Sequence, residues 1–459
     1  MKDFLSVKNS VKLSKNSTGL PAVIILFFMV FLSSPGLAAG LIWAPPHLEP
    51  LIAEALENNR SIRSFAARAK AFKTRIPAAS ALPDPKLGFA VQSLPTDSFA
   101  FDQEPMTQKQ IFVEQTVPWL SKLELRSETA AGKAVQKMAE LKAIRLELAR
   151  EVAVAWYELG YVAESQQINN EMFELVRRIR RDAESRYAVG RGQQQDIFQA
   201  EVELSGLKDE AIRLETLRKS IEDRLHELTN RERYRSLEPP SQLPEPDFRF
   251  SAPALAENAL VQNPKLRELK AAIDSARAET GLAEKEFYPD FNVRLSYGQR
   301  DQDRTGRELP DFFSVAVALD IPLWHKKKQS IELAAAMDDQ RSVQSRYQDL
   351  KSRLPYTIHS LTSKIDDTRR RYRLYTDELI PQAEQRARSA LDAYQVNNVE
   401  FDTMIKARIQ VLKYKQEARR LFYTTYQKRA EIEALIGGIP GNMHKRVSPI
   451  SKGRTHAEQ

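Results

Sequence analysis

The sequence predicts a mixed α/β membrane protein, built mainly of long antiparallel coiled-coil helices with four β-strands and an internal two-fold repeat. Two observations predict this fold: residue types recur at an almost constant offset, and paired alternating apolar segments precede very long helical stretches. At an offset of 204 residues, the matched positions are Leu51/Leu255, Ala55/Ala259, Leu56/Leu260, Asn59/Asn263, Ala67/Ala271, Pro85/Pro289 and Pro118/Pro322. At an offset of 207 residues, they are Tyr187/Tyr394, Val189/Val396 and Ala200/Ala407. The matches divide the chain into repeat one (residues 39–230), a proline-rich connector (231–253) and repeat two (254–436).

Residues 1–38 have the three parts of a secretory signal peptide. The apolar stretch Leu20–Leu32 has 13 residues, fewer than the roughly 20 that a membrane-spanning helix needs. The basic segment before it and the small residues after it are Lys2, Lys8, Lys12, Lys15, Pro35, Gly36 and Ala38. Cleavage would remove four lysines and Asp3, and would lower the formal net charge from +8 to +5. We therefore expect an exported protein whose dispersed charges do not favour a nucleic-acid partner.

The first strand pair belongs to repeat one. A helix is expected over about Leu48–Ala81, because Pro83 and Pro85 would end it. Alternating apolar residues then predict strands over Lys86–Leu94 and Gln108–Val117.

The second strand pair, in repeat two, follows a predicted helix over about Leu255–Phe287 and alternates more cleanly. Its predicted lipid-facing residues are Phe291, Val293, Leu295, Val315, Val317 and Leu319. Asn292, Arg294, Ser314 and Asp320 are expected on the opposite face, toward a lumen. Strands of about 8 to 11 residues can cross a bilayer when tilted, and Trp119 and Trp324 at matching strand exits are expected at its interface.

Four strands cannot close a barrel, and lipid does not tolerate an open sheet edge. Several chains must therefore contribute strands, and three chains would give a twelve-stranded barrel. A two-sided soluble β-layer is the alternative interpretation of the same alternation.

Each strand pair precedes a long helical stretch. Residues 121–186 contain no proline, which predicts one helix about 100 Å long, and Ser121 with Glu124 predicts a capping box at its start. Its counterpart over about Lys326–Ala393 contains Pro355 and Pro381, where bends are expected.

Tight turns near residues 187–192 and 394–398 lead into shorter returning helices with coiled-coil spacing. We expect the first returning helix and the helix over 255–287 to stack end to end beside the unbroken helix. Residues 437–459 are polar and irregular, and are expected to be a disordered tail.

Catalytic and metal-binding patterns do not occur in the sequence. Its six histidines are scattered, its few methionines are dispersed, and it contains no cysteine. No nucleophile–base pair or glycine-rich phosphate loop is recognisable. We therefore expect neither an enzyme nor a cofactor nor a metal site.

The twofold repeat, the proline-ended strand pairs and the Tyr-Ala-Val-Gly turn at 187–190 together resemble the TolC-like outer-membrane efflux protein family, over about Leu48–Ile436. The resemblance implies a homotrimer in the outer membrane of a Gram-negative bacterium, with a twelve-stranded β-barrel and a periplasmic α-barrel. It implies a passive channel that receives substrates from an inner-membrane pump and a periplasmic adaptor.

The resemblance also implies functional residues at the helix tips. Gly190, Arg191, Gly192, Asn397 and Asn398 are expected to dock the adaptor. Tyr394, Glu400 and Asp402 are candidate gate residues, although Val399 stands where well-known members have an arginine. The alternative is that the two carboxylates only stabilise a helix start.

The cargo is left open by the sequence. Residues Glu104–Gln108, with Gln115 and Pro118, are similar to the branch that serves heavy-metal efflux pumps. An outer-membrane duct for drug or protein (type I) secretion is an alternative. A soluble periplasmic coiled-coil adaptor or structural protein is another, and dependence on detergent would distinguish it.

Overall fold

The computed structural model describes residues 47–231, 237–240, 243–396 and 398–438. The predicted signal peptide, Asn397 and residues 439–459 of the predicted tail lie outside these ranges.

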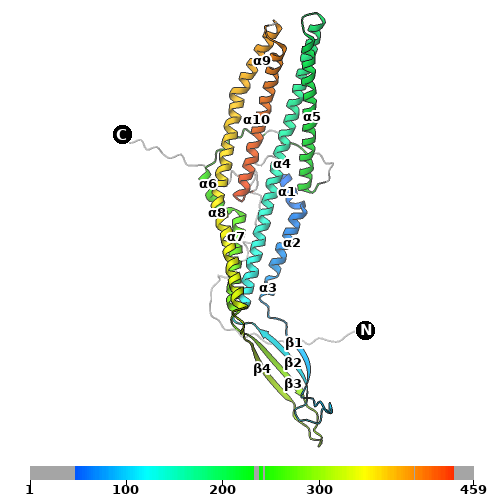
Figure 1. Cartoon of the computed structure of the whole chain (residues 1–459), viewed down its shortest axis with the longest axis vertical. Coiled ribbons are helices and arrows are strands. Elements are labelled where there is room, and N and C mark those ends of the chain that lie inside the picture. Colours follow the sequence, from blue (N-terminus) through cyan, green and yellow to red (C-terminus); the bar gives the residue numbers. More distant parts are fainter. Residues whose placement is uncertain (1–46, 232–236, 241–242, 397, 439–459) are drawn as a thin grey trace, which may run out of the picture. The chain divides into compact units, whose positions relative to one another are not determined.

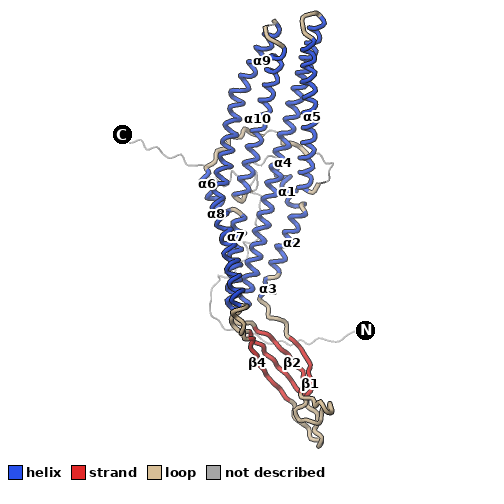
Figure 2. The backbone as a smooth tube through the Cα atoms, in the orientation of Figure 1, coloured by secondary structure: helices blue, strands red, loops and turns tan. Residues whose placement is uncertain are grey.

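A similar order of elements, with helices before and after a strand pair, occurs twice along the described chain (Figures 1 and 2). The first series is α1 (Leu48–Asn58), α2 (Arg60–Thr74), α3 (Ile76–Ala79), β1 (Lys86–Gln92), β2 (Gln108–Val117), α4 (Lys122–Ala188) and α5 (Gln194–Thr229). The second is α6 (Ala252–Gln262), α7 (Pro264–Lys285), β3 (Asp290–Gln299), β4 (Phe312–Asp320), α8 (Gln329–Leu374), the π-helical turn η1 (Tyr375–Leu379), α9 (Ile380–Gln395) and α10 (Phe401–Leu435).

The four strands form one antiparallel sheet in the order β1-β2-β3-β4. The predicted hairpins are present, and β2 also pairs with β3 from Lys109↔Gln299 to Val117↔Phe291. This pairing joins the two halves of the chain. β1 and β4 are the edges of the sheet, and each has one free side within this chain.

Helix α4 is the central helix of the fold, with 67 residues and contacts to α2, α5, α7 and α10. Its buried middle includes Trp156, whose Nε1 donates a hydrogen bond to the carbonyl of Glu238 at 3.1 Å. Tyr157 packs beside it against Tyr426 of α10. The connector is therefore attached to the same core that joins α4 to α10.

The chain forms two helical hairpins, α4/α5 and α9/α10 (Figure 1). Both pack through apolar seams. In one cluster, Val176 and Ile179 of α4 meet Ala200 and Leu204 of α5, together with Met404 of α10. These residues are spaced by threes and fours, as the predicted coiled-coil packing requires.

The two predicted helices that precede the strands are interrupted at matching asparagines. Asn59 has a non-helical backbone (φ −64°, ψ 120°), and its Oδ1 accepts hydrogen bonds from the amides of Ser61 and Ile62. Asn263 makes the same cap with Lys265 and Leu266. The continuous helix expected over Leu48–Ala81 is therefore three helices, and the one expected over Leu255–Phe287 is two.

The expected stacking of the first returning helix on residues 255–287 is wrong. Asn59 Nδ2 donates to the carbonyl of Leu228, near the end of α5, at 3.1 Å. Asn263 Nδ2 donates to the carbonyl of Leu435, at the end of α10, at 2.9 Å. Each returning helix thus meets the short helices of its own series, because the connector carries the chain from α5 away to α6, which packs on α8.

Of the two prolines where bends are expected, Pro355 lies within α8, and Pro381 follows η1, where the amide of Ile380 bonds to the carbonyl of Tyr375. Two further boundaries differ from the sequence expectations. Ser121 forms no side-chain cap, because its left-handed backbone (φ 73°) departs from the extended cap conformation. Gly437 and Gly438, the expected start of the tail, instead end α10 through hydrogen bonds to Ala434 and Glu433.

Candidate functional site

The sheet has one apolar face, and this face is exposed. Cross-strand pairs Phe291↔Leu319, Val293↔Val317 and Leu295↔Val315 lie on it. Phe89 and Phe313 on the same face are 77% and 72% exposed. The six residues predicted to face lipid thus share one face, and β1 and β2 extend it.

The opposite face of the sheet is polar and internally bonded. Gln110 Nε2 donates to Ser296 Oγ at 3.1 Å, and Thr116 Oγ1 donates to Asn292 Oδ1 at 2.6 Å. Asn292 Nδ2 donates in turn to Asp320 at 3.0 Å. Ser296 is only 7% exposed. On β2 and β3, the burial of the two faces is the reverse of that in a water-soluble sheet, where apolar side chains are covered and polar ones face solvent.

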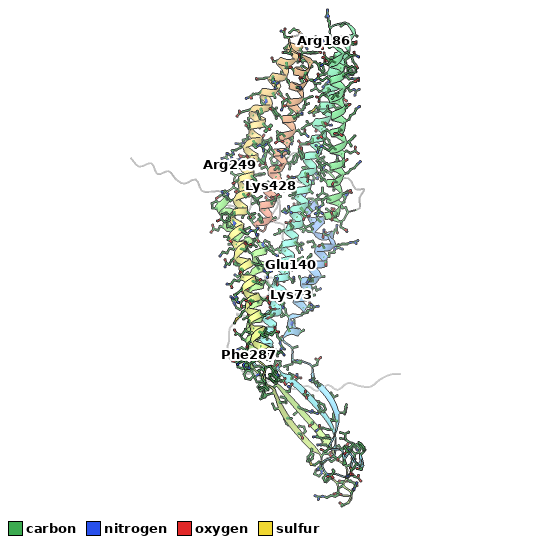
Figure 3. All side chains as sticks on the ribbon, in the orientation of Figure 1. Lys73, Glu140, Arg186, Arg249, Phe287 and Lys428 are labelled. Carbon is green, nitrogen blue, oxygen red and sulfur yellow. The ribbon has the colours of Figure 1, made fainter. Side chains whose placement is uncertain are left out.

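A buried lysine joins the sheet to the helices. Lys122, in the first turn of α4, is 1% exposed. Its ammonium lies 3.1 Å from a Glu286 carboxylate oxygen and 2.9 Å from Asp290 Oδ1, and it donates to the carbonyl of Tyr288 at 3.2 Å. Figure 3 labels Phe287 in this region.

Sequence reasoning missed this lysine. A signal was available, because a lysine at a helix N-terminus opposes the helix dipole and needs a specific anionic partner.

The two predicted interface tryptophans are not equivalent. Trp119 stacks on Tyr288 and Phe291 with ring centroids 5.1 and 5.6 Å apart, and its amide donates to Asp290. Trp324 is 77% exposed. Both follow strands that end beside the start of β3, so they lie at the same end of the sheet.

The helix tips lie beyond the last turns of α4 and α9, and each turn contains the same kind of backbone hydrogen bond. The amide of Arg191 donates to the carbonyl of Arg186, and the amide of Asn398 donates to the carbonyl of Ala393, both at 2.8 Å. Gly190 has φ +71°, a conformation that favours glycine. Figure 3 labels Arg186 at this end of α4.

The predicted docking and gate residues line one cavity of about 740 Å³ at these tips. The residues of both groups that line it are Gly190, Arg191, Gly192, Tyr394, Asn398, Glu400 and Asp402. Asn397, predicted with them, lies outside the described residues.

Tyr394 connects the two hairpins at the tips. The guanidinium of Arg186 lies 4.5 Å from the centre of the Tyr394 ring, and the Tyr394 hydroxyl donates to Asp196 of α5 at 3.4 Å. Partial burial raises the pKa of Tyr394, and the nearby Asp196 carboxylate raises it further. The phenol therefore stays neutral and can donate.

Asp402 makes a second connection between the hairpins. It accepts hydrogen bonds from Gln199 of α5 and from Lys406 of its own helix, the latter at 2.8 Å. The hydrogen bond from Lys406 lowers the pKa of Asp402. Glu400, by contrast, is exposed at the start of α10. Two of the three candidate gate residues therefore bond across the hairpins.

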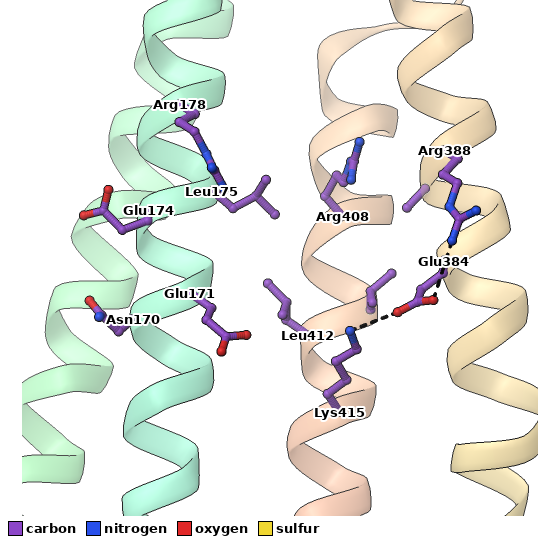
Figure 4. Close-up of a pocket in the computed structure, with 12 residues that line it drawn as sticks. Asn170, Glu171, Glu174, Leu175, Arg178, Glu384, Arg388, Arg408, Leu412 and Lys415 are labelled. Atoms are coloured by element: carbon purple, nitrogen blue, oxygen red, sulfur yellow. Dashed lines mark ion pairs between the residues drawn. The ribbon is translucent and has the colours of Figure 1, made fainter.

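A groove of about 570 Å³ lies further along the helices, between α4 and the α9/α10 hairpin (Figure 4). Leu175 and Leu412 lie on its two sides. On the α9/α10 side, Glu384 pairs with Lys415 at 2.9 Å and with Arg388 at 3.9 Å.

Within the described ranges, no three side chains of histidine, aspartate or glutamate come together as metal ligands. No described helix is both long enough and apolar enough to cross a membrane.

Comparison with known proteins gives a family match over most of the chain. The family model described as outer membrane efflux protein matches residues 51–231 and 255–438. No curated protein matches the sequence.

Several solved structures share the fold at low sequence identity. The outer membrane protein VceC from Vibrio cholerae is 18% identical, with 85% of this chain and 96% of that chain covered and a TM-score of 0.73. The CmeC outer membrane channel of Campylobacter jejuni is 13% identical, with 86% of each chain covered and a TM-score of 0.68. CusC is 15% identical, with coverages of 86% and 93% and a TM-score of 0.69.

Proposed function

The chain belongs to the outer membrane efflux protein family, and we propose that it is the outer-membrane channel subunit of a tripartite efflux system. Members of this family are non-enzymatic channels of the Gram-negative outer membrane. In the proposed system, a homotrimer receives substrate from an inner-membrane pump through a periplasmic adaptor.

The exposed apolar face of the sheet carries this proposal. β2, β3 and β4 have 9 or 10 residues, the length of a tilted bilayer crossing, and β1 has 7. All neighbouring strands are antiparallel, so β1 and β4 run in opposite directions. The free side of β4 can therefore pair in antiparallel fashion with β1 of a second copy, and three copies close twelve strands without an edge.

The proposal predicts a detergent-dependent trimer that conducts ions. The test is to purify the full chain, measure its mass in detergent, and insert it into planar lipid bilayers. Trimeric mass and stepwise conductance are expected. A water-soluble monomer that leaves bilayers silent would contradict the channel and would favour the adaptor alternative.

Tyr394 and Asp402 are proposed to hold the tips closed. The double variant Tyr394→Phe, Asp402→Ala removes the bonds to Asp196 and Gln199, and is expected to raise the conductance of these channels. Because the pKa of Asp402 is lowered, its carboxylate stays charged until the pH falls through that lowered value. Wild-type closure through Asp402 is therefore expected to be constant from about pH 5 to 8.

The control for the gate is Glu215→Gln, because Glu215 is an exposed carboxylate of α5 that pairs with Lys219 of the same helix. If the double variant conducts as the wild type does, Tyr394 and Asp402 do not hold the tips closed.

The tip turns are proposed to dock the adaptor. About 100 Å of uninterrupted α4 separates them from the sheet, so in the proposed channel they would lie far from the membrane. A photo-reactive residue in place of Arg191 is expected to cross-link to the adaptor, and one in place of Arg213, along α5, is the comparison. Equal cross-linking from both positions would argue against docking at the tips.

Heavy-metal cations are one proposed cargo, alongside drugs and proteins. The metal proposal rests on the similarity of residues 104–108 to the metal-efflux branch. Residues 104–107 form a turn: the amide of Thr107 donates to the Glu104 carbonyl, and the hydroxyl of Thr107 donates to the Ser93 carbonyl at 2.8 Å. These bonds stabilise the loop before β2 and use none of its carboxylates. Sensitivity of a strain lacking the chain to metal salts but not to drugs would favour the metal branch.

A further inference from the structure

An aromatic ring and a guanidinium are stacked on the polar face of the sheet. Gly88 of β1 lies opposite Phe112 of β2, and the ring occupies the space that a glycine side chain leaves. A Cβ added at Gly88 would lie 2.3 Å from the ring. The guanidinium carbon of Arg294 on β3 lies 3.4 Å from the ring centre. Covering a strand glycine with an aromatic ring is a known way to stabilise a sheet, and here the ring also positions a cation.

One net positive charge remains at the level of the sheet that holds Arg294. Its cross-strand neighbour Glu114 lies 3.5 Å from Lys86, and no carboxylate in the described chain lies within 4 Å of Arg294. At the helix end of this face, Asp290 pairs with Lys122 and Asp320 accepts from Asn292.

From Arg294 to the loop end of the strands, the polar face carries no acidic side chain. Its residues there are Gly88, Ala90, Gln92, Gln108, Gln110, Phe112, Ser296, Gly298, Phe312 and Ser314. A positive charge therefore stands near the middle of the sheet without a compensating carboxylate on the way out.

We infer that Arg294 is a selectivity residue of the pore, and that it favours anionic or neutral cargo over free cations. The inference rests on the proposed channel, in which the polar face lines the lumen. Threefold repetition would place three guanidinium groups in one ring, and rings of arginine favour anions in pores. A metal cargo would then leave more readily as an anionic complex than as a hydrated cation.

The test is the reversal potential of single channels in a KCl gradient. The variant Arg294→Gln is expected to lower the chloride-to-potassium permeability ratio by roughly threefold or more at low salt, and by less at high salt. Arg294→Lys keeps the charge and is expected to keep the ratio near that of the wild type. Carboxylates at the tips are the same in all variants, so the comparison isolates the ring.

A second variant guards against misfolding of Arg294→Gln. Ala316 of β4 is the exposed cross-strand neighbour of Arg294, so Ala316→Glu places a carboxylate beside the intact guanidinium. Ala316→Glu is expected to lower the chloride-to-potassium permeability ratio, as Arg294→Gln does.

Three outcomes are decisive. A permeability ratio that Arg294→Gln leaves at the wild-type value would overturn the inference and leave the channel intact, whatever the effect of Ala316→Glu. An equal fall in Arg294→Lys and Arg294→Gln would also overturn it, because only the stacked geometry would then matter. A wild-type protein that forms no channel would overturn the proposed function itself.

Discussion

Replacement of Lys122 by methionine is expected to destabilise the protein by about 3 kcal/mol, because it leaves two carboxylates without their buried partner. The side chain of Lys122 is 2% exposed, whereas those of Glu286 and Asp290 are 42% and 22% exposed. The value is placed at the lower end of the range for broken buried pairs, because water can still reach both acids. Methionine retains the apolar length of the lysine side chain, so the loss is mainly that of the charge.

Urea unfolding in detergent measures this change in free energy. Arg126→Met is the matched control: Arg126 lies 3.8 Å from the same Glu286 but is 37% exposed, so the expected loss is below about 1 kcal/mol. Equal losses in the two variants would mean that Lys122 does not link the sheet to the helices.

Arginine in place of Val317 is expected to prevent assembly in the membrane. Val317 lies near the middle of β4 on the apolar face and is 63% exposed within one chain. If that face contacts lipid, a charge near the bilayer midplane costs about 2–4 kcal/mol in each subunit. In a sheet that faces water, the same change would cost little.

Ala318→Arg provides the comparison for Val317→Arg. Ala318 directly follows Val317. Because side chains alternate along a strand, Ala318 lies on the polar face, opposite Asn292. The yield of trimer extracted from outer membranes is expected to fall sharply for Val317→Arg and to change little for Ala318→Arg. Equal yields would show that the two faces of the sheet do not differ in their contact with lipid.

The sequence predicted those helices and strands in which apolar residues recur at a regular spacing. The second strand was expected over Gln108–Val117, and β2 has these bounds. The helix expected over residues 121–186 is α4, Lys122–Ala188. Period-two and heptad patterns report which side chains share a face, and the family match agrees with the resemblance that they supported.

The parts that were missed depend on contacts between distant segments. The β2–β3 pairing, the burial of Lys122 and the meeting of α5 with α1 leave no periodic trace in the sequence. The helix breaks had a usable signal, because Asn59 and Asn263 match across the repeat and asparagine is a strong N-cap residue. At the tips, the sequence indicated Tyr394 and Asp402, but only the structure gave their partners, Asp196 and Gln199.

The paired asparagine caps have a mechanical consequence. Each one adds an amide donor to the packing of a returning helix on a short helix, at the Leu228 or Leu435 carbonyl, whereas α4 beside them has no break. We infer that the two joints are pivots for local opening, because the helical backbone is interrupted at each asparagine and is unbroken in α4. Faster deuterium uptake at Leu266 in an Asn263→Ala protein, with uptake in the middle of α4 unchanged, would reveal such a pivot; uniform uptake would rule it out.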